Sequence, residues 1–149
     1  MSRVKIDLPG RFQFSTDIPV RIGDINYGGH LGNDALLSIL QEARVQLLRC
    51  HGWNELNVEG VGLIMTDAAI AYRSEAFCGD VLRIDIAVSD FSSAGCDIVY
   101  RVRNVSDDRL VAQAKTGIAF FDYAARRVVA VPSAFADKFR TDTGHASNP

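Results

Sequence analysis

Apolar residues recur at helical spacing in residues 33–50, and this segment dominates the hydrophobic pattern of the chain. Positions i, i+4, i+7 and i+11 of the segment fall on one face of an α-helix: Leu36, Leu40, Ala43 and Leu47. Three further apolar residues widen this face: Leu37, Ile39 and Leu48. Because most of the helix is then apolar, we expect it to lie deep inside the fold. No other segment has the pattern of a long helix.

Alternating apolar and polar positions predict strands in the rest of the chain. Residues 11–22 have the alternation of a half-buried strand, with these apolar residues on one side: Phe12, Phe14, Ile18, Val20 and Ile22. Pro19 has no N–H group for the ladder, so this strand should lie at a sheet edge or contain a bulge. Four more strands are predicted after the helix: residues 61–73, 81–88, 96–104 and 110–122. Short turns join the last three, which therefore should be antiparallel neighbours.

The order of these elements predicts an α+β protein, in which a five-stranded antiparallel sheet wraps around the central helix. A brief second helix should follow Pro132, and a length of 149 residues suits a single domain, residues 1–149. We expect residues 1–10 to be a flexible lead-in and residues 141–149 a flexible polar tail. So small a sheet leaves its edges unpaired and part of the helix uncovered. We therefore expect a homodimer, which could pair further into a homotetramer.

The composition argues against several kinds of partner. Hydrophobic residues make up 48% of the chain and charged residues 23%, the balance of a globular protein. The formal net charge of −2 provides no basic surface for nucleic acid or acidic lipid. The first residues lack the apolar core of a secretory signal, and no apolar run approaches the ~20 residues of a membrane span. Three widely spaced cysteines suit free thiols, so we expect a cytoplasmic location.

Several common catalytic motifs are absent from the sequence. It contains no GxSxG, HExxH, Walker or GxGxxG pattern. The three histidines, His30, His51 and His145, lack the spacing of a metal site, so we expect no metal. The candidates narrow to the loop GDINYGGHLGND, residues 23–34, just before the long helix. This loop carries a carboxylate, an imidazole and two amides: Asp24, His30, Asn26 and Asn33.

A helix start adds to these side chains backbone N–H groups without an intrahelical acceptor and a positive partial charge. Such a place can polarise a carbonyl group and stabilise the oxyanion that forms when the carbonyl is attacked. A nearby carboxylate could activate water or attack the carbonyl itself. The same residue types are also common turn formers, and Asn33 or Asp34 could simply cap the helix. The residues alone leave both interpretations open.

Residues 24–33, DINYGGHLGN, resemble the D-x-[DN]-x-x-G-H-x-x-N motif of acyl-CoA thioesterases of the 4-hydroxybenzoyl-CoA thioesterase type, which have the hotdog fold. Residues 42–44 match the E-A-R sequence that these proteins carry further along their central helix. A third similarity, to their bend after the second strand, comes from Tyr72, Arg73, Phe77, Gly79 and Asp80. The resemblance covers residues 12–123, and its order of elements agrees with the order predicted above.

This resemblance implies hydrolysis of an acyl-CoA thioester to a free acid and CoA. Asp24 would be the catalytic carboxylate, acting as general base or nucleophile on the thioester carbonyl. The backbone N–H of His30 or Leu31 would face the carbonyl oxygen, and His30 would also orient the loop, the water or the thioester. Substrate contacts are expected from four residues: Asn26, Gly29, Leu31 and Asn33. The family needs no metal or other cofactor, because CoA is part of the substrate.

Three alternatives remain at this stage. Members of the family differ in whether the carboxylate lies in the loop or on the helix, so Glu42 is a second candidate. Glu42 could equally be a buried or interface carboxylate paired with an arginine. The loop also resembles the G-D-x-N-P-x-H motif of R-specific enoyl-CoA hydratases. However, Tyr27 stands in place of the proline and His30 lies one residue too far along, which favours the thioesterase. The third alternative is a non-catalytic hotdog dimer that binds an acyl chain or a CoA ester.

Overall fold

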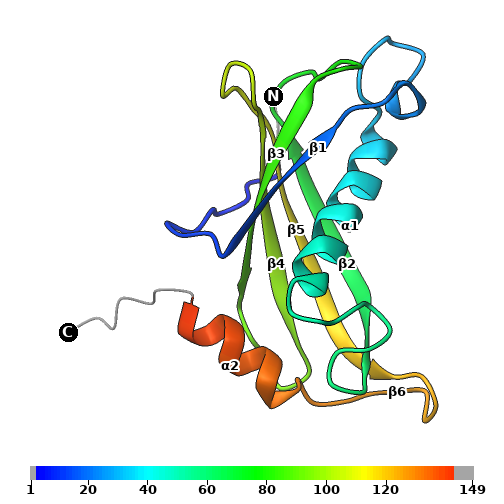
Figure 1. The fold of residues 1–149 in the computed structure, drawn as a ribbon, viewed down its shortest axis with the longest axis vertical. Coiled ribbons are helices and arrows are strands. Elements are labelled where there is room, and N and C mark those ends of the chain that lie inside the picture. The colour runs from blue at the N-terminus through cyan, green and yellow to red at the C-terminus, as the bar shows by residue number, and fades with distance from the viewer. Residues whose placement is uncertain (1–2, 143–149) are drawn as a thin grey trace.

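The computed structural model describes residues 3–142, in which a curled antiparallel sheet packs against one long helix (Figure 1). The helices and strands follow in this order: β1 (Phe14–Pro19), the 3-10 turn η1 (Ile22–Asp24), α1 (Asn33–Arg49), β2 (Gly62–Tyr72), β3 (Val81–Ser89), β4 (Gly95–Asn104), β5 (Leu110–Asp122), β6 (Arg127–Val128) and α2 (Ser133–Asp142). The strand order is β1-β3-β4-β5-β2, and the two-residue β6 pairs with β5. Every pairing is antiparallel. The predicted fold is therefore confirmed.

The apolar face of α1 forms the centre of the core. Its four predicted positions are at most 1% exposed: Leu36, Leu40, Ala43 and Leu47. They share one cluster with the inward-facing residues of β3, all of which are fully buried: Leu82, Ile84, Ile86 and Val88. Alternate residues of a strand point to the same face of a sheet, so all four of these β3 side chains lie on the face that packs against α1.

The core-facing side of α1 is buried as expected, and its other side is open to solvent, as expected for a helix that so small a sheet covers only in part. Leu37 is 37% exposed, and Gln41 and Glu42 on the following turn are exposed as well. Leu37 is rotated by about 100° from Leu36, so it lies beyond the stripe that the sheet covers. The sheet of a single chain therefore covers only part of the helix surface.

The first strand is shorter than its alternating pattern predicted. It ends at Pro19, and the Val20 N–H bonds to the carbonyl of Asp80 before the chain enters η1. Ile22 lies in η1 and is 77% exposed, so its assignment to the buried face was wrong. The alternation continued past the end of the strand without a sheet to support it. The edge position inferred from Pro19 is confirmed, because β1 pairs with β3 alone.

The two ends of the chain pack at separate places. Ile6 and Leu8 of the lead-in contact the outer face of the sheet at Ala71 and Val99. At the other end, α2 lies at the end of the sheet away from the loop before α1 (Figure 1). It begins just after Pro132, as predicted. Most of the predicted tail, residues 143–149, lies outside the described residues. No helix in residues 3–142 is long and apolar enough to cross a bilayer.

Candidate active site

The loop before α1 is shaped by short hydrogen bonds within itself. The Asp24 carboxylate accepts the backbone N–H of Arg21 at 2.9 Å, which closes the turn of η1. The Asn26 side-chain oxygen accepts the N–H of Gly28 at 2.9 Å, as in an Asx turn. Gly29 has a φ of +83°, a conformation that a residue without a Cβ adopts readily. Asp24 and Asn26 therefore act at least as turn formers.

The start of α1 has no side-chain cap, so the prediction that Asn33 or Asp34 caps it was wrong. Gly32 occupies the N-cap position, and Asn33 and Asp34 are already the first two helical residues. The first helical N–H with a backbone acceptor is that of Leu36, which bonds to the carbonyl of Gly32 at 3.2 Å. The N–H groups of Asn33, Asp34 and Ala35 thus have no acceptor among the described residues. They are available to an anion or a carbonyl oxygen.

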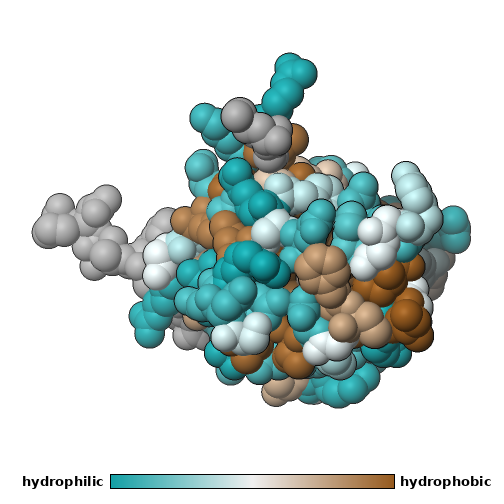
Figure 2. Space-filling model, turned by 90° about the horizontal axis from the view of Figure 1, so that it is seen from above, coloured by the Kyte–Doolittle hydropathy of each residue, from teal (hydrophilic) through white to brown (hydrophobic). Residues whose placement is uncertain are grey.

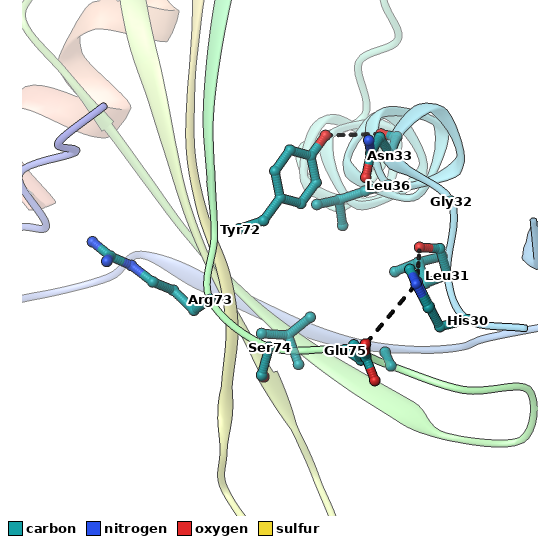
Figure 3. A pocket seen from close by; sticks show the side chains of 11 residues that line it. His30, Leu31, Gly32, Asn33, Leu36, Tyr72, Arg73, Ser74 and Glu75 are labelled. Carbon is teal, nitrogen blue, oxygen red and sulfur yellow. Dashed lines mark hydrogen bonds and ion pairs between the residues drawn. The ribbon is translucent and has the colours of Figure 1, made fainter. Parts of the chain in front are cut away.

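A cavity of about 240 Å³ opens beside this uncapped helix start (Figure 3). Its lining comes from the loop, the first turns of α1, the end of β2 with the following bend, and β5: His30, Leu31, Gly32, Asn33, Leu36, Tyr72, Arg73, Ser74, Glu75, Ala76 and Val111. Apolar residues supply the floor, and the polar side chains of His30, Tyr72 and Glu75 lie at the rim. An apolar group with a polar, reactive end would suit this lining.

Tyr72 connects β2 to the helix start. Its hydroxyl donates a hydrogen bond of 3.0 Å to the carbonyl of Asn33, and Figure 3 shows the ring pointing that way. Partial burial and the nearby Asp34 carboxylate raise the pKa of the Tyr72 phenol. Tyr72 therefore remains a protonated donor at neutral pH. The adjacent Arg73 points away from the cavity and binds Gln113 at 2.9 Å.

Glu75 is a site residue that the sequence did not predict. Its carboxylate lies 4.0 Å from Nε2 of His30, across the rim of the cavity (Figure 3). Among the described residues, it is the one carboxylate that lines this cavity. The other ring nitrogen of His30, Nδ1, lies 3.2 Å from the carbonyl oxygen of Leu31. The sequence resembled a known bend in this region, but nothing in its spacing connected position 75 with the loop.

The structure brings together only some of the predicted site residues. His30, Leu31 and Asn33 line the cavity, whereas Asp24, Asn26 and Gly29 do not. The predicted substrate contact from the Leu31 N–H is corrected, because this group donates to the carbonyl of Ala76 at 2.8 Å. Of the two backbone donors proposed for the carbonyl oxygen, only that of His30 has no acceptor within residues 3–142.

In the E-A-R segment of α1, residues 42–44, the arginine is buried and binds other residues of the fold. Arg44 is 6% exposed and donates to Glu55 at 2.7 Å and to the Tyr100 hydroxyl at 3.1 Å. Glu42 is exposed and lies outside the cavity, and the arginine in its motif binds Glu55 instead. Glu42 is therefore not a buried carboxylate paired with an arginine of its own chain, and its role as an interface carboxylate stays a prediction.

The cysteines and the possible metal ligands of the described residues bear on thiol and metal chemistry. Cys50 and Cys78 are exposed free thiols, and Cys96 is a buried one. Burial raises the pKa of the Cys96 thiol to about 12, so this group stays protonated and unreactive at neutral pH. The His, Cys, Asp and Glu side chains of residues 3–142 include no group of three or more that could hold a metal ion.

A curled antiparallel sheet wrapped around one long helix is the hotdog fold. The solved structures similar to this one include a 1,4-dihydroxy-2-naphthoyl-CoA thioesterase from Synechocystis, with 20% identity, a TM-score of 0.76 and coverage of 91% of this chain and 98% of that one. A Staphylococcus aureus protein in complex with CoA has 16% identity, a TM-score of 0.79 and coverage of 93% and 88%. At these identities the likeness establishes the fold.

The family of the chain is established by comparing its sequence with models of protein families. The model of the thioesterase-like superfamily matches residues 20–139, which include the loop, the helix and every strand after it. The chain therefore belongs to the thioesterase-like superfamily. None of the curated proteins matches its sequence.

Proposed function

We propose that this protein hydrolyses an acyl-CoA thioester to a free acid and CoA. The observation that carries the proposal is the uncapped start of α1, whose free N–H groups lie beside a cavity with an apolar floor. The acyl group occupies the floor, and its carbonyl oxygen lies toward the first turn of the helix. These N–H groups and the helix dipole stabilise the negative charge that develops on that oxygen. CoA enters as part of the substrate, and no further cofactor is required.

Asp24 is the proposed catalytic carboxylate, acting as general base or nucleophile. As a base, it accepts a proton from the water that attacks the carbonyl carbon; the C–S bond then breaks, and the CoA thiolate leaves and takes up a proton. The Asp24 side chain is 14% exposed, and its backbone carbonyl accepts the Gly32 N–H at 2.9 Å. Asp24 thus lies close to the helix start, although its carboxylate does not line the cavity of the single chain.

A homodimer completes the substrate cleft in this proposal. β2 is an unpaired sheet edge, and large apolar side chains are exposed on β2 and on α1: Leu37 at 37%, Met65 at 49% and Tyr72 at 45%. Viewed from the loop end, apolar areas likewise interrupt the polar surface (Figure 2). A second copy seated on β2 would pair the edge and cover these side chains. The cleft would then extend beyond the cavity of one chain toward Asp24.

Met65→Lys tests this assembly. Met65 is an exposed residue at a bulge of β2, so a lysine there should leave the fold of one chain intact. It would place a charge in the proposed contact, so light scattering should report a dimer for the wild type and a monomer for the variant. Val4→Lys, at an exposed position in the lead-in, is the control and should remain dimeric. A monomeric wild type at working concentration would remove the basis for a shared cleft.

The proposed activity is tested by measuring thiol release from a panel of aromatic and aliphatic acyl-CoAs, beside an enoyl-CoA hydration assay. We expect thiol release and no hydration. In residues 3–142, no hydrogen bond or ion pair joins Asp24 to His30, whereas a hydratase needs the two groups to act on the same water. Hydration without thiol release would contradict the proposal. Tight binding of acyl-CoA without turnover would identify a non-catalytic binding protein instead.

A further inference from the structure

We propose that Glu75 is a positioning residue, which holds the imidazole of His30 toward the reacting thioester. This inference rests on the proposed thioesterase function and adds to it a residue that the loop motif does not contain. The contact that carries it joins the Glu75 carboxylate to Nε2 of His30 at 4.0 Å, at the rim of the cavity (Figure 3). Both residues line the cavity next to the uncapped start of α1.

The bend that carries Glu75 is fastened on both sides. On the loop side, the Leu31 N–H donates to the carbonyl of Ala76 at 2.8 Å. On the sheet side, Ser74 Oγ donates to the carbonyl of the first residue of β5 at 2.7 Å. Arg109 Nη2 donates to the backbone carbonyl of Glu75 itself at 2.9 Å. These bonds fix the main chain of residue 75 relative to the loop, so the separation of Glu75 from His30 follows from the fold.

The ring of His30 has an oxygen beside each of its nitrogens. Nδ1 lies 3.2 Å from the carbonyl oxygen of Leu31, and Nε2 faces the carboxylate of Glu75. The Leu31 contact is local and limits rotation of the ring, while the Glu75 contact sets which way Nε2 points. Without the carboxylate, Nε2 would have no protein partner among the described residues, and the ring could turn away from the cavity. Orientation of a group beside a reacting centre affects rate strongly.

Folding stability should depend little on this contact. The Glu75 side chain is 64% exposed and that of His30 is 33% exposed. Ion pairs at such positions contribute little to stability, because water screens them and both side chains lose freedom on pairing. A substitution at Glu75 should therefore change the rate of thiol release without changing the melting temperature. A merely structural carboxylate would do the opposite.

The experiment is a double-mutant cycle on thiol release, with Glu75→Gln, His30→Ala and the double variant. Glu75→Gln preserves the size of the side chain and removes its charge. We expect it to lower kcat by about 10-fold with KM unchanged, a size common for coupled neighbours. Because Glu75 acts through His30, the double variant should be no slower than His30→Ala alone. Glu59→Gln, at an exposed position outside the cavity, is the matched control and should behave as the wild type.

Each result leads to a definite conclusion. Wild-type kcat in Glu75→Gln, or losses that multiply in the double variant, would overturn the positioning role while the wild-type enzyme still released thiol. A fall in melting temperature of Glu75→Gln that accounts for its lost activity would also overturn it. Absence of thiol release from the wild type on every acyl-CoA would contradict the proposed function itself, and with it the role of Glu75.

Discussion

Leu40→Asp should prevent the chain from folding. Leu40 is fully buried in the middle of the α1 face that packs on the sheet. The substitution loses about 1.5–3 kcal/mol of apolar burial and adds several kcal/mol for a buried carboxylate without a partner. Together these costs are comparable with the ~5–15 kcal/mol that stabilises a whole domain. The variant should be insoluble on expression or should lack a cooperative thermal transition in circular dichroism.

Leu37→Asp is the matched control for this prediction. It makes the same chemical change on the same helix, but Leu37 is 37% exposed on the side that the sheet leaves open. Its carboxylate stays in water, so the chain should fold and melt cooperatively, even if assembly is impaired. A soluble Leu40→Asp protein with a cooperative transition would show that the helix does not lie where the hydrophobic pattern places it.

The sequence predicted the core well because periodicity reports burial directly. The spacing of Leu36, Leu40 and Leu47 predicted which face of the helix is buried. The alternation in β3 likewise predicted which face of that strand is buried. The same patterns were misleading where no neighbouring layer existed. Ile22 continued an alternation beyond the end of its strand, and Leu37 widened an apolar face beyond the reach of a small sheet. The hydrophobic pattern of one segment does not show how far the sheet or helix packed against it extends.

The N-cap of α1 was less predictable, because neighbouring residues of types that favour this position, Asn or Asp and Gly, follow one another here. Asn33 and Asp34 are good caps, yet Gly32 occupies the N-cap. A Cβ at position 32 would lie 2.7 Å from a carboxylate oxygen of Asp34, so that side chain would have to move. With glycine at that position, the first N–H groups remain free of a side-chain acceptor. The sequence pattern placed the start of the helix correctly. It did not predict that the first N–H groups of the helix would be free of a side-chain acceptor.

Glu75 escaped prediction for a different reason. The bend after β2 meets the loop before α1 only because the sheet brings β2 alongside the helix start, and the Leu31 N–H then bonds to the carbonyl of Ala76. Contacts between segments so distant in sequence leave no periodic signal in a single chain. The motif in residues 24–33 could identify the loop, whereas the side chains that face the loop had to come from the fold.

Asp24→Asn should reduce thiol release by ~10²–10⁴-fold, the usual loss when a positioned acid–base group is removed. The fold should survive, because an asparagine side-chain oxygen can still accept the Arg21 N–H that closes η1. The variant should therefore keep its melting temperature and oligomeric state while its kcat falls. Asp34→Asn is the control: it removes a carboxylate from the helix start outside the cavity, and should change kcat far less.

The order of two losses separates the proposed reaction from hydration. His30→Ala should cost less than Asp24→Asn, because His30 orients the reactants and Asp24 takes part in bond making. In a hydratase both groups would act on one water, so either change would abolish enoyl-CoA hydration and no thiol would be released by any variant. If Asp24→Asn releases thiol as fast as the wild type, the assignment of Asp24 fails. Glu42→Gln would then be the next substitution, since a second subunit could bring this exposed carboxylate to the cleft.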